Sequence, residues 1–137
     1  MIKKIIAGLG GAIALNLLHE IVRKTCKDVP HINELGEEAL QKSLSKINYS
    51  IDDKSALYAA TLSGDIISNT MYYAFTATNQ MVASGSLAGV AAVVLPSVLG
   101  LNNSPTAGTN KRKALTVAYY LFGAAVTKMI YKRLNRA

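Results

Sequence analysis

Apolar residues gather in four long segments of the chain, at about 5–23, 56–78, 82–101 and 114–131. Each segment is close to the roughly 20 residues that an α-helix needs to cross the hydrocarbon core of a bilayer. None of them alternates between apolar and polar residues in the manner of a strand. The pattern therefore predicts an all-α integral membrane protein, with residues 1–137 forming a single domain built as a four-helix bundle.

The long polar connection between the first two segments predicts a helix of its own, at about 30–48. Its apolar positions recur at helical spacing: Ile32, Leu35, Ala39, Leu40, Leu44 and Ile47. A helix with one apolar face of this kind is typical of the membrane interface. Asp28 and Pro30 are expected to start it, and Asp52 and Asp53 to cap the segment that follows.

The third segment is rich in small residues and follows the second after a very short link. Only residues 79–81 separate the two, which predicts a tight antiparallel hairpin. Gly85 and Gly89 form a small-xxx-small pair that allows another helix to approach closely. Pro96 is expected to kink this helix. The glycine pair favours self-association or docking into a larger membrane complex.

Polar residues inside the apolar segments are the main candidates for function. One face of the first segment carries Asn16, His19, Glu20 and Arg23. One face of the second carries Thr61, Asp65, Ser68 and Asn69. A carboxylate at bilayer depth costs about 2.5–3.5 kcal/mol on insertion scales, so Asp65 is expected to have a partner or a task there.

The two polar faces are expected to meet. Asn16 and Asp65 both lie near the middle of their segments, displaced towards the same connection. Helices in lipid turn such faces towards each other or towards a water-filled cavity. We expect a polar ladder that runs inwards in this order: Arg23, Glu20 with His19, then Asp65 with Asn16 and Asn69.

Two functions fit this pattern. In the first, the protein is an oligomeric channel or carrier for protons, cations or a small solute, with Asp65 as its central ionisable site. In the second, it is a non-catalytic structural or assembly subunit of a membrane complex, and Asp65 is protonated or hydrogen-bonded to hold two helices together. Metal or lipid chemistry at His19, Glu20 and Asp65 is a third alternative.

Catalytic patterns are weak in this chain. The run His19-Glu20-x-x-Arg23 differs from the zinc-binding motif H-E-x-x-H at its second ligand. We therefore expect no enzyme, no cofactor and no metal. Cys26 is the only cysteine, so no disulfide can form within the chain.

Composition supports a membrane protein, because 50% of the residues are hydrophobic and only 17% are charged, against about 25% in a typical soluble domain. The net charge of +7 comes from short basic clusters at segment ends, which indicate anchors at lipid headgroups rather than a nucleic-acid surface. We expect the lipid bilayer as partner, no nucleic acid, and a multi-pass location in the cell membrane. A soluble helical bundle is the alternative, although residues 82–101 carry no charge.

The ends of the chain bear on its orientation. The start resembles a signal peptide, but the apolar pattern continues to Val22, so we expect this segment to be retained as a spanning helix. Lysines and arginines are more numerous in the first and third connections than at the termini and in the middle turn. The positive-inside rule then favours both termini outside.

Overall fold

The computed structural model describes all 137 residues, as helices joined by short connections and without strands. In chain order they are α1 (Ile2–Thr25), α2 (Ile32–Ser45), α3 (Lys54–Phe75), α4 (Met81–Val98), α5 (Ser104–Ala107) and α6 (Asn110–Arg136). The prediction of an all-α protein is confirmed.

Three helices, α1, α4 and α6, are long and apolar enough to cross a membrane, which indicates a multi-pass membrane protein. Helix α3 is not among them, although it has 22 residues. Its apolar sequence is interrupted by Asp65, Ser68 and Asn69. Three of the four predicted spanning helices are therefore supported.

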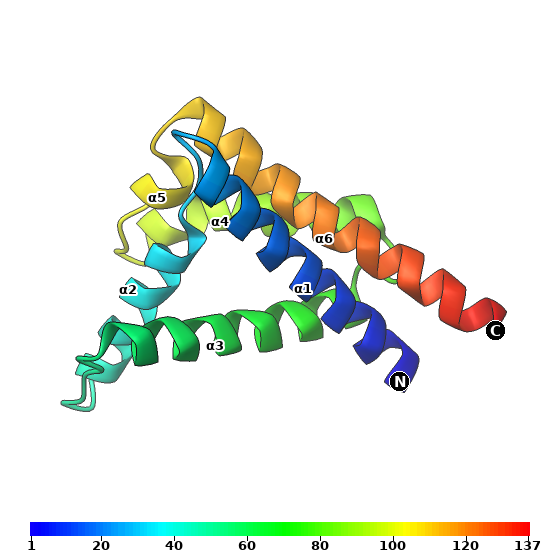
Figure 1. Ribbon diagram of the computed structural model, residues 1–137, viewed down its shortest axis with the longest axis horizontal. Helices are drawn as coiled ribbons and strands as arrows, with labels where there is room; N and C mark the ends of the chain where they lie inside the picture. The colour runs from blue at the N-terminus through cyan, green and yellow to red at the C-terminus, as the bar shows by residue number, and fades with distance from the viewer.

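Helix α6 is central to the arrangement. Helix α1 packs along one side of α6 and α4 packs along another, while α3 packs on α1. In Figure 1, α1 and α6 run side by side in opposite directions, so the two termini lie at the same end of the molecule. Helix α3 runs at an angle to both, and α2 connects the far end of α1 to the start of α3.

The glycine pair of α4 lies in the contact with α6. A Cβ atom added at Gly85 would lie 2.7 Å from Leu121 Cα, and one at Gly89 would lie 2.6 Å from Val117 Cα. Both positions therefore need glycine for the two backbones to approach this closely. Because the pair is occupied by α6 of the same chain, self-association needs a different surface and stays a prediction.

Glycines of α1 make equally close contacts on two sides. A Cβ at Gly8 would lie 2.9 Å from the Ala74 backbone nitrogen in α3, and one at Gly11 would lie 2.5 Å from the Gly123 carbonyl oxygen in α6. The ring of Tyr73 fills the corner between the three helices, since a Cβ at Gly123 would lie 2.8 Å from its Cε2. Helices α1, α3 and α6 thus meet at one close-packed junction.

Helices α3 and α4 do not form the predicted antiparallel hairpin. Near their short connection, the Tyr72 hydroxyl donates to the Ser84 carbonyl (2.8 Å) and the Thr76 and Ser84 hydroxyls lie 2.6 Å apart. Beyond this point the helices diverge, because the close contacts of α3 are with α1 and those of α4 are with α6. Connection length alone was therefore a wrong guide to their packing.

Pro96 lies in the last turn of α4 and is buried. It has no N–H to donate to the Ala92 carbonyl, and the Thr106 hydroxyl donates to that carbonyl instead (3.1 Å). The helix ends at Val98, before the predicted residue 101. Gly100 has a φ of 72°, and Leu101 N–H donates to Pro96 O (2.7 Å), as in a Schellman motif.

Helix α2 is shorter than the predicted 30–48, and its N-cap is His31. Asp28 does not start it, because that carboxylate pairs with Arg112 at the beginning of α6 (3.1 Å). Asp53 caps α3 as predicted, accepting from Ala56 N–H at 2.8 Å.

Gly89→Ala should lower the free energy of unfolding by about 1–3 kcal/mol, because the new methyl group meets the α6 backbone. Gly64→Ala is the matched control, since a Cβ at Gly64 has no neighbour within 4 Å. There the higher helix propensity of alanine should add up to about 1 kcal/mol. Unfolding in detergent followed by circular dichroism measures both, and equal midpoints for the two variants contradict the α4–α6 contact.

Candidate functional site

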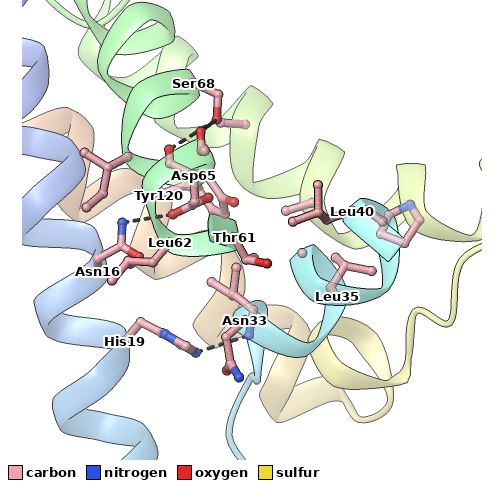
Figure 2. A pocket seen from close by; sticks show the side chains of 18 of the residues that line it. Asn16, His19, Asn33, Leu35, Leu40, Thr61, Leu62, Asp65, Ser68 and Tyr120 are labelled. Atoms are coloured by element: carbon pink, nitrogen blue, oxygen red, sulfur yellow. Dashed lines mark hydrogen bonds between the residues drawn. The ribbon is translucent and has the colours of Figure 1, made fainter. Parts of the chain in front are cut away.

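The divergence of α3 from α4 leaves a cleft with a volume of about 810 Å³. Figure 2 shows α1 and α3 on one side of it, with α2 and α4 across from them. Most lining residues are apolar, among them Leu17, Leu95 and Leu99. These three are 58%, 49% and 68% exposed, so the cleft is open to its surroundings. Its volume falls in the range of ligand pockets, about 300–1,000 Å³.

Asp65 lines this cleft from the middle of α3. Its Oδ2 accepts from the Asn16 side-chain amide of α1, and its Oδ1 accepts from the Asn69 amide one turn further along α3, both at 2.9 Å. The Asn16 amide also donates to the Ala12 carbonyl, which fixes its rotamer (2.9 Å). The structure thus brings together the three innermost residues of the expected ladder, and two of them hold α1 against α3 (Figure 2).

The charge of an ionised Asp65 has no compensating cation in the chain. Its two partners are neutral amides, and no ion pair involves it. Lysine and arginine are both absent from the cleft lining. Each carboxylate oxygen accepts one hydrogen bond from the protein and keeps further lone-pair capacity. The group is therefore oriented by its neighbours but not neutralised by them.

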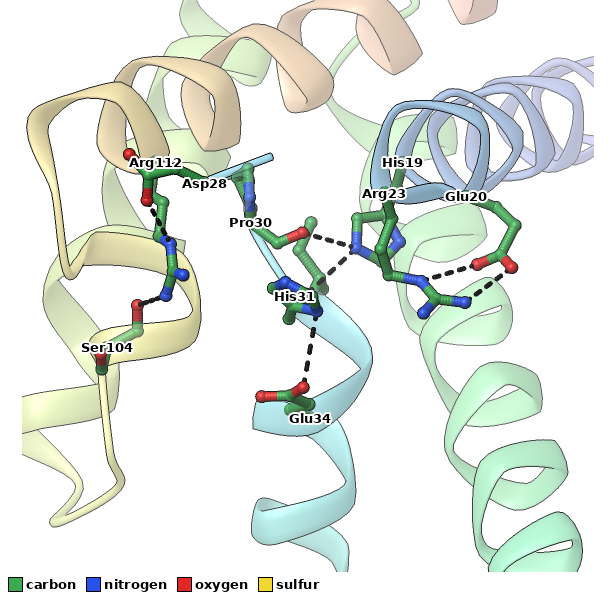
Figure 3. Close-up of polar contacts among 10 residues, drawn as sticks. His19, Glu20, Arg23, Asp28, Pro30, His31, Glu34, Ser104 and Arg112 are labelled. Atoms are coloured by element: carbon green, nitrogen blue, oxygen red, sulfur yellow. Dashed lines mark hydrogen bonds and ion pairs between the residues drawn. The ribbon is translucent and has the colours of Figure 1, made fainter. Parts of the chain in front are cut away.

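Glu20 and Arg23 do not continue the ladder to Asp65. Glu20 pairs with Arg23 (2.7 Å) and Lys24 (3.2 Å), both on its own helix. Its side chain lies at the edge of the cleft and is 28% exposed. Because both cations lie three and four residues from Glu20 on the same helix, they satisfy Glu20 locally. The expected continuous ladder is therefore wrong at this step. Figure 3 shows the pairing of Glu20 with Arg23.

His19 faces the chain connection instead of Asp65. Its Nε2 lies 3.1 Å from the Pro30 carbonyl oxygen (Figure 3) and 3.2 Å from the Ile32 backbone nitrogen. Its ring packs edge-on against Tyr119, with 5.9 Å between the ring centroids. One nitrogen either donates to the carbonyl or accepts from the N–H, according to the tautomer. The connection folds back over the end of α1 and supplies both backbone groups. His19 thus holds the start of α2 close to α1.

Asn33 and Thr61 also line the cleft, but the sequence pattern did not predict an unpaired polar atom at either residue. Asn33 Oδ1 and Thr61 Oγ1 are buried and have no hydrogen-bond partner, and both residues line the cleft. Thr61 lies on the polar face that contains Asp65, which is a signal the sequence offers. Asn33 follows the first apolar residue of α2, and nothing in its local pattern distinguishes it from a solvated helix position.

No group of three His, Cys, Asp or Glu side chains lies close enough together to hold a metal ion. In comparisons with known proteins, no family model, no curated protein and no solved structure matches this chain. The function must therefore be inferred from the cleft itself.

Asn16 and Asp65 should be energetically coupled. A double-mutant cycle with Asn16→Ala and Asp65→Ala is expected to give a coupling of about 0.6–1.7 kcal/mol, the range of hydrogen bonds between membrane helices. Ser63, which bonds only within α3, supplies the control pair with Asn16 and should give none. Unfolding by detergent titration measures both cycles, and a coupling no larger than the control removes this hydrogen bond as a link between α1 and α3.

His19→Leu should loosen the start of α2, because the Ile32 N–H loses the ring nitrogen. Amide exchange at residue 32 is expected to accelerate by up to about tenfold, the equivalent of one hydrogen bond. His31→Leu is the control, since that imidazole pairs with Glu34 (3.4 Å) and makes no capping hydrogen bond to α2. Similar exchange rates at residue 32 in the two variants exclude the assigned role of His19.

Proposed function

We propose that this protein is a carrier in the cell membrane that binds a small cationic solute in its cleft, with Asp65 as the central site. The observation that carries the proposal is an oriented carboxylate, without a countercharge, on the wall of an apolar cleft. Ionisable groups at membrane depth commonly mark the paths of ions and substrates. The cleft lies within one chain, which favours a carrier over a pore formed between subunits.

Helix α3 serves in this proposal as a fourth, partly polar membrane segment. Its 22 residues span about 33 Å at 1.5 Å per residue, enough for the hydrocarbon core. Ile67, Met71 and Phe75 are 65%, 43% and 53% exposed and form an apolar outer face. The polar face with Asp65 is turned inwards to α1 and the cleft. Such a division suits a helix that borders lipid on one side and a binding site on the other.

Helix α2 supplies the closure that a carrier requires. It lies against α3, and its residues form part of the cleft lining. Lys42 donates to the Gly100 carbonyl, and the Glu38 carboxylate accepts from Asn102 N–H (3.1 Å), so its polar side is tethered to the end of α4. In our proposal α2 lies at the membrane interface and covers one end of the cleft.

A second candidate is a structural subunit of a membrane complex. The observation that favours it is the hydrogen bonding of both Asp65 oxygens by amides, one from each of two packed helices. Polar groups of this kind can hold membrane helices together without any transport role.

Asp65→Asn should remove charge movement while the fold persists, because the amide keeps the shape of the side chain without its charge. Proteoliposomes on a sensor surface are exposed to protons, sodium, potassium and alkylammonium ions from methyl to octyl, and the transient current is recorded against protein-free vesicles. Asp53→Asn is the matched control, since asparagine also caps a helix well. We expect current from the wild type and from Asp53→Asn, and none from Asp65→Asn.

The outcomes separate the two candidates. No current from the wild type with any cation contradicts the carrier. Undiminished current in Asp65→Asn would show that Asp65 is not the central transport site. A variant that no longer folds or assembles, with no wild-type current, favours the structural subunit.

A further inference from the structure

The charge lining the cleft is of one sign. Glu20 and Asp65 contribute carboxylates, and no lysine or arginine faces them from the lining. Glu20 is satisfied by Arg23 and Lys24 on its own helix. Only Asp65 therefore lacks a countercharge, and a cation is the complementary occupant at that point of the wall.

Two further oxygens of cleft residues have no hydrogen-bond partner. Thr61 precedes Asp65 by one helical turn on α3, and its buried Oγ1 is unpaired. Asn33 reaches the same cleft from α2, and its buried Oδ1, which can only accept, is also unpaired. Buried polar atoms nearly always have partners. A protonated primary amine offers three N–H donors, so it can serve the Asp65 carboxylate and the Thr61 hydroxyl one turn away on the same helix.

The opposite wall has a different character. Helix α4 contributes only apolar side chains to the lining, among them Ala88, Ala92 and Leu95. A small hydrated cation would leave this wall in contact with its water. A solute with an apolar chain would cover it and gain about 0.8 kcal/mol, or about fourfold in affinity, for each buried methylene.

We propose that the cleft binds an amphiphilic primary amine, with its ammonium group at Asp65 and its apolar chain along α4. This inference rests on the proposed function, because it names the chemical class of the solute at the same site. An amphiphile with an anionic head is disfavoured, since it would place a second negative charge beside the Asp65 carboxylate. A bilayer lipid without an amine could fill the apolar part alone, but it would leave Asp65 without a countercharge and the Thr61 hydroxyl without a partner.

Equilibrium dialysis of the full chain in nanodiscs tests the proposal with methyl-, butyl- and octylammonium, octanoate and octanol. Empty nanodiscs correct for partition into lipid. We expect saturable binding of the ammonium ions that strengthens by about fourfold per methylene, with octanol and octanoate binding at least about tenfold more weakly than octylammonium. Asp65→Asn should weaken octylammonium binding by about tenfold or more, the equivalent of a hydrogen bond to a charged group.

Thr61→Val keeps the test valid if Asp65→Asn does not fold, because valine preserves the shape of threonine without its hydroxyl. It should weaken octylammonium binding by about threefold to tenfold, whereas Ser63→Ala, outside the lining, should not. Equal binding of octanol and octylammonium, no dependence on chain length, or unchanged binding in both cleft variants overturns the proposal. Amine binding without current refutes only the carrier, and current with inorganic cations but no amine binding refutes only the solute class.

Discussion

Two glycines one turn apart on α1 determine where the other helices lie. Gly8 meets α3 and Gly11 meets α6 at distances that any Cβ would prevent. Helices α3 and α6 are therefore fixed on neighbouring faces of α1, with the Tyr73 ring between them. Helix α4 is held in the same way on α6 by Gly85 and Gly89. Since α3 and α4 are fixed to different helices, they separate beyond their connection, and the cleft is the direct result.

Asp65 lies where the dry packing of α3 ends. All buried residues of α3, Asn69, Thr70, Tyr73 and Ala74, come after it in the sequence. Before it, the helix lines the cleft and approaches α2. The hydrogen bonds from Asn16 and Asn69 thus close the α1–α3 contact on its cleft side. The Asp65 carboxylate is held by these two amides on the side of the α1–α3 contact, and it borders the cleft on the other side. This position suits both helix packing and ligand binding.

Hydrophobic periodicity and polar spacing were sufficient to predict the five longer helices, though not α5, and the meeting of Asn16, Asp65 and Asn69. Side chains four residues apart share a helix face. They could not predict which neighbour each small-residue row would pack against, since a small-xxx-small row is compatible with several partners. The wrong hairpin followed from the short link at residues 79–81, because a short connection does not determine whether two helices pack along their length. His19 was misplaced for a different reason: its partners are the Pro30 carbonyl and the Ile32 N–H, and backbone groups of a connection leave no pattern in the sequence.

The choice of a carboxylate at position 65 bears on the two candidate functions. An asparagine there could accept one hydrogen bond from Asn16 or Asn69 and donate another, so it could join the same helices without an ionisable group. The carboxylate instead accepts from both amides, and it carries a desolvation cost that its neutral partners only partly offset. Thr61 and Asn33 add unpaired oxygens at the same cleft, which a purely structural contact does not require. A primary ammonium group at Asp65 would supply the missing countercharge and a donor for Thr61 on the same helix, whereas helix packing supplies neither.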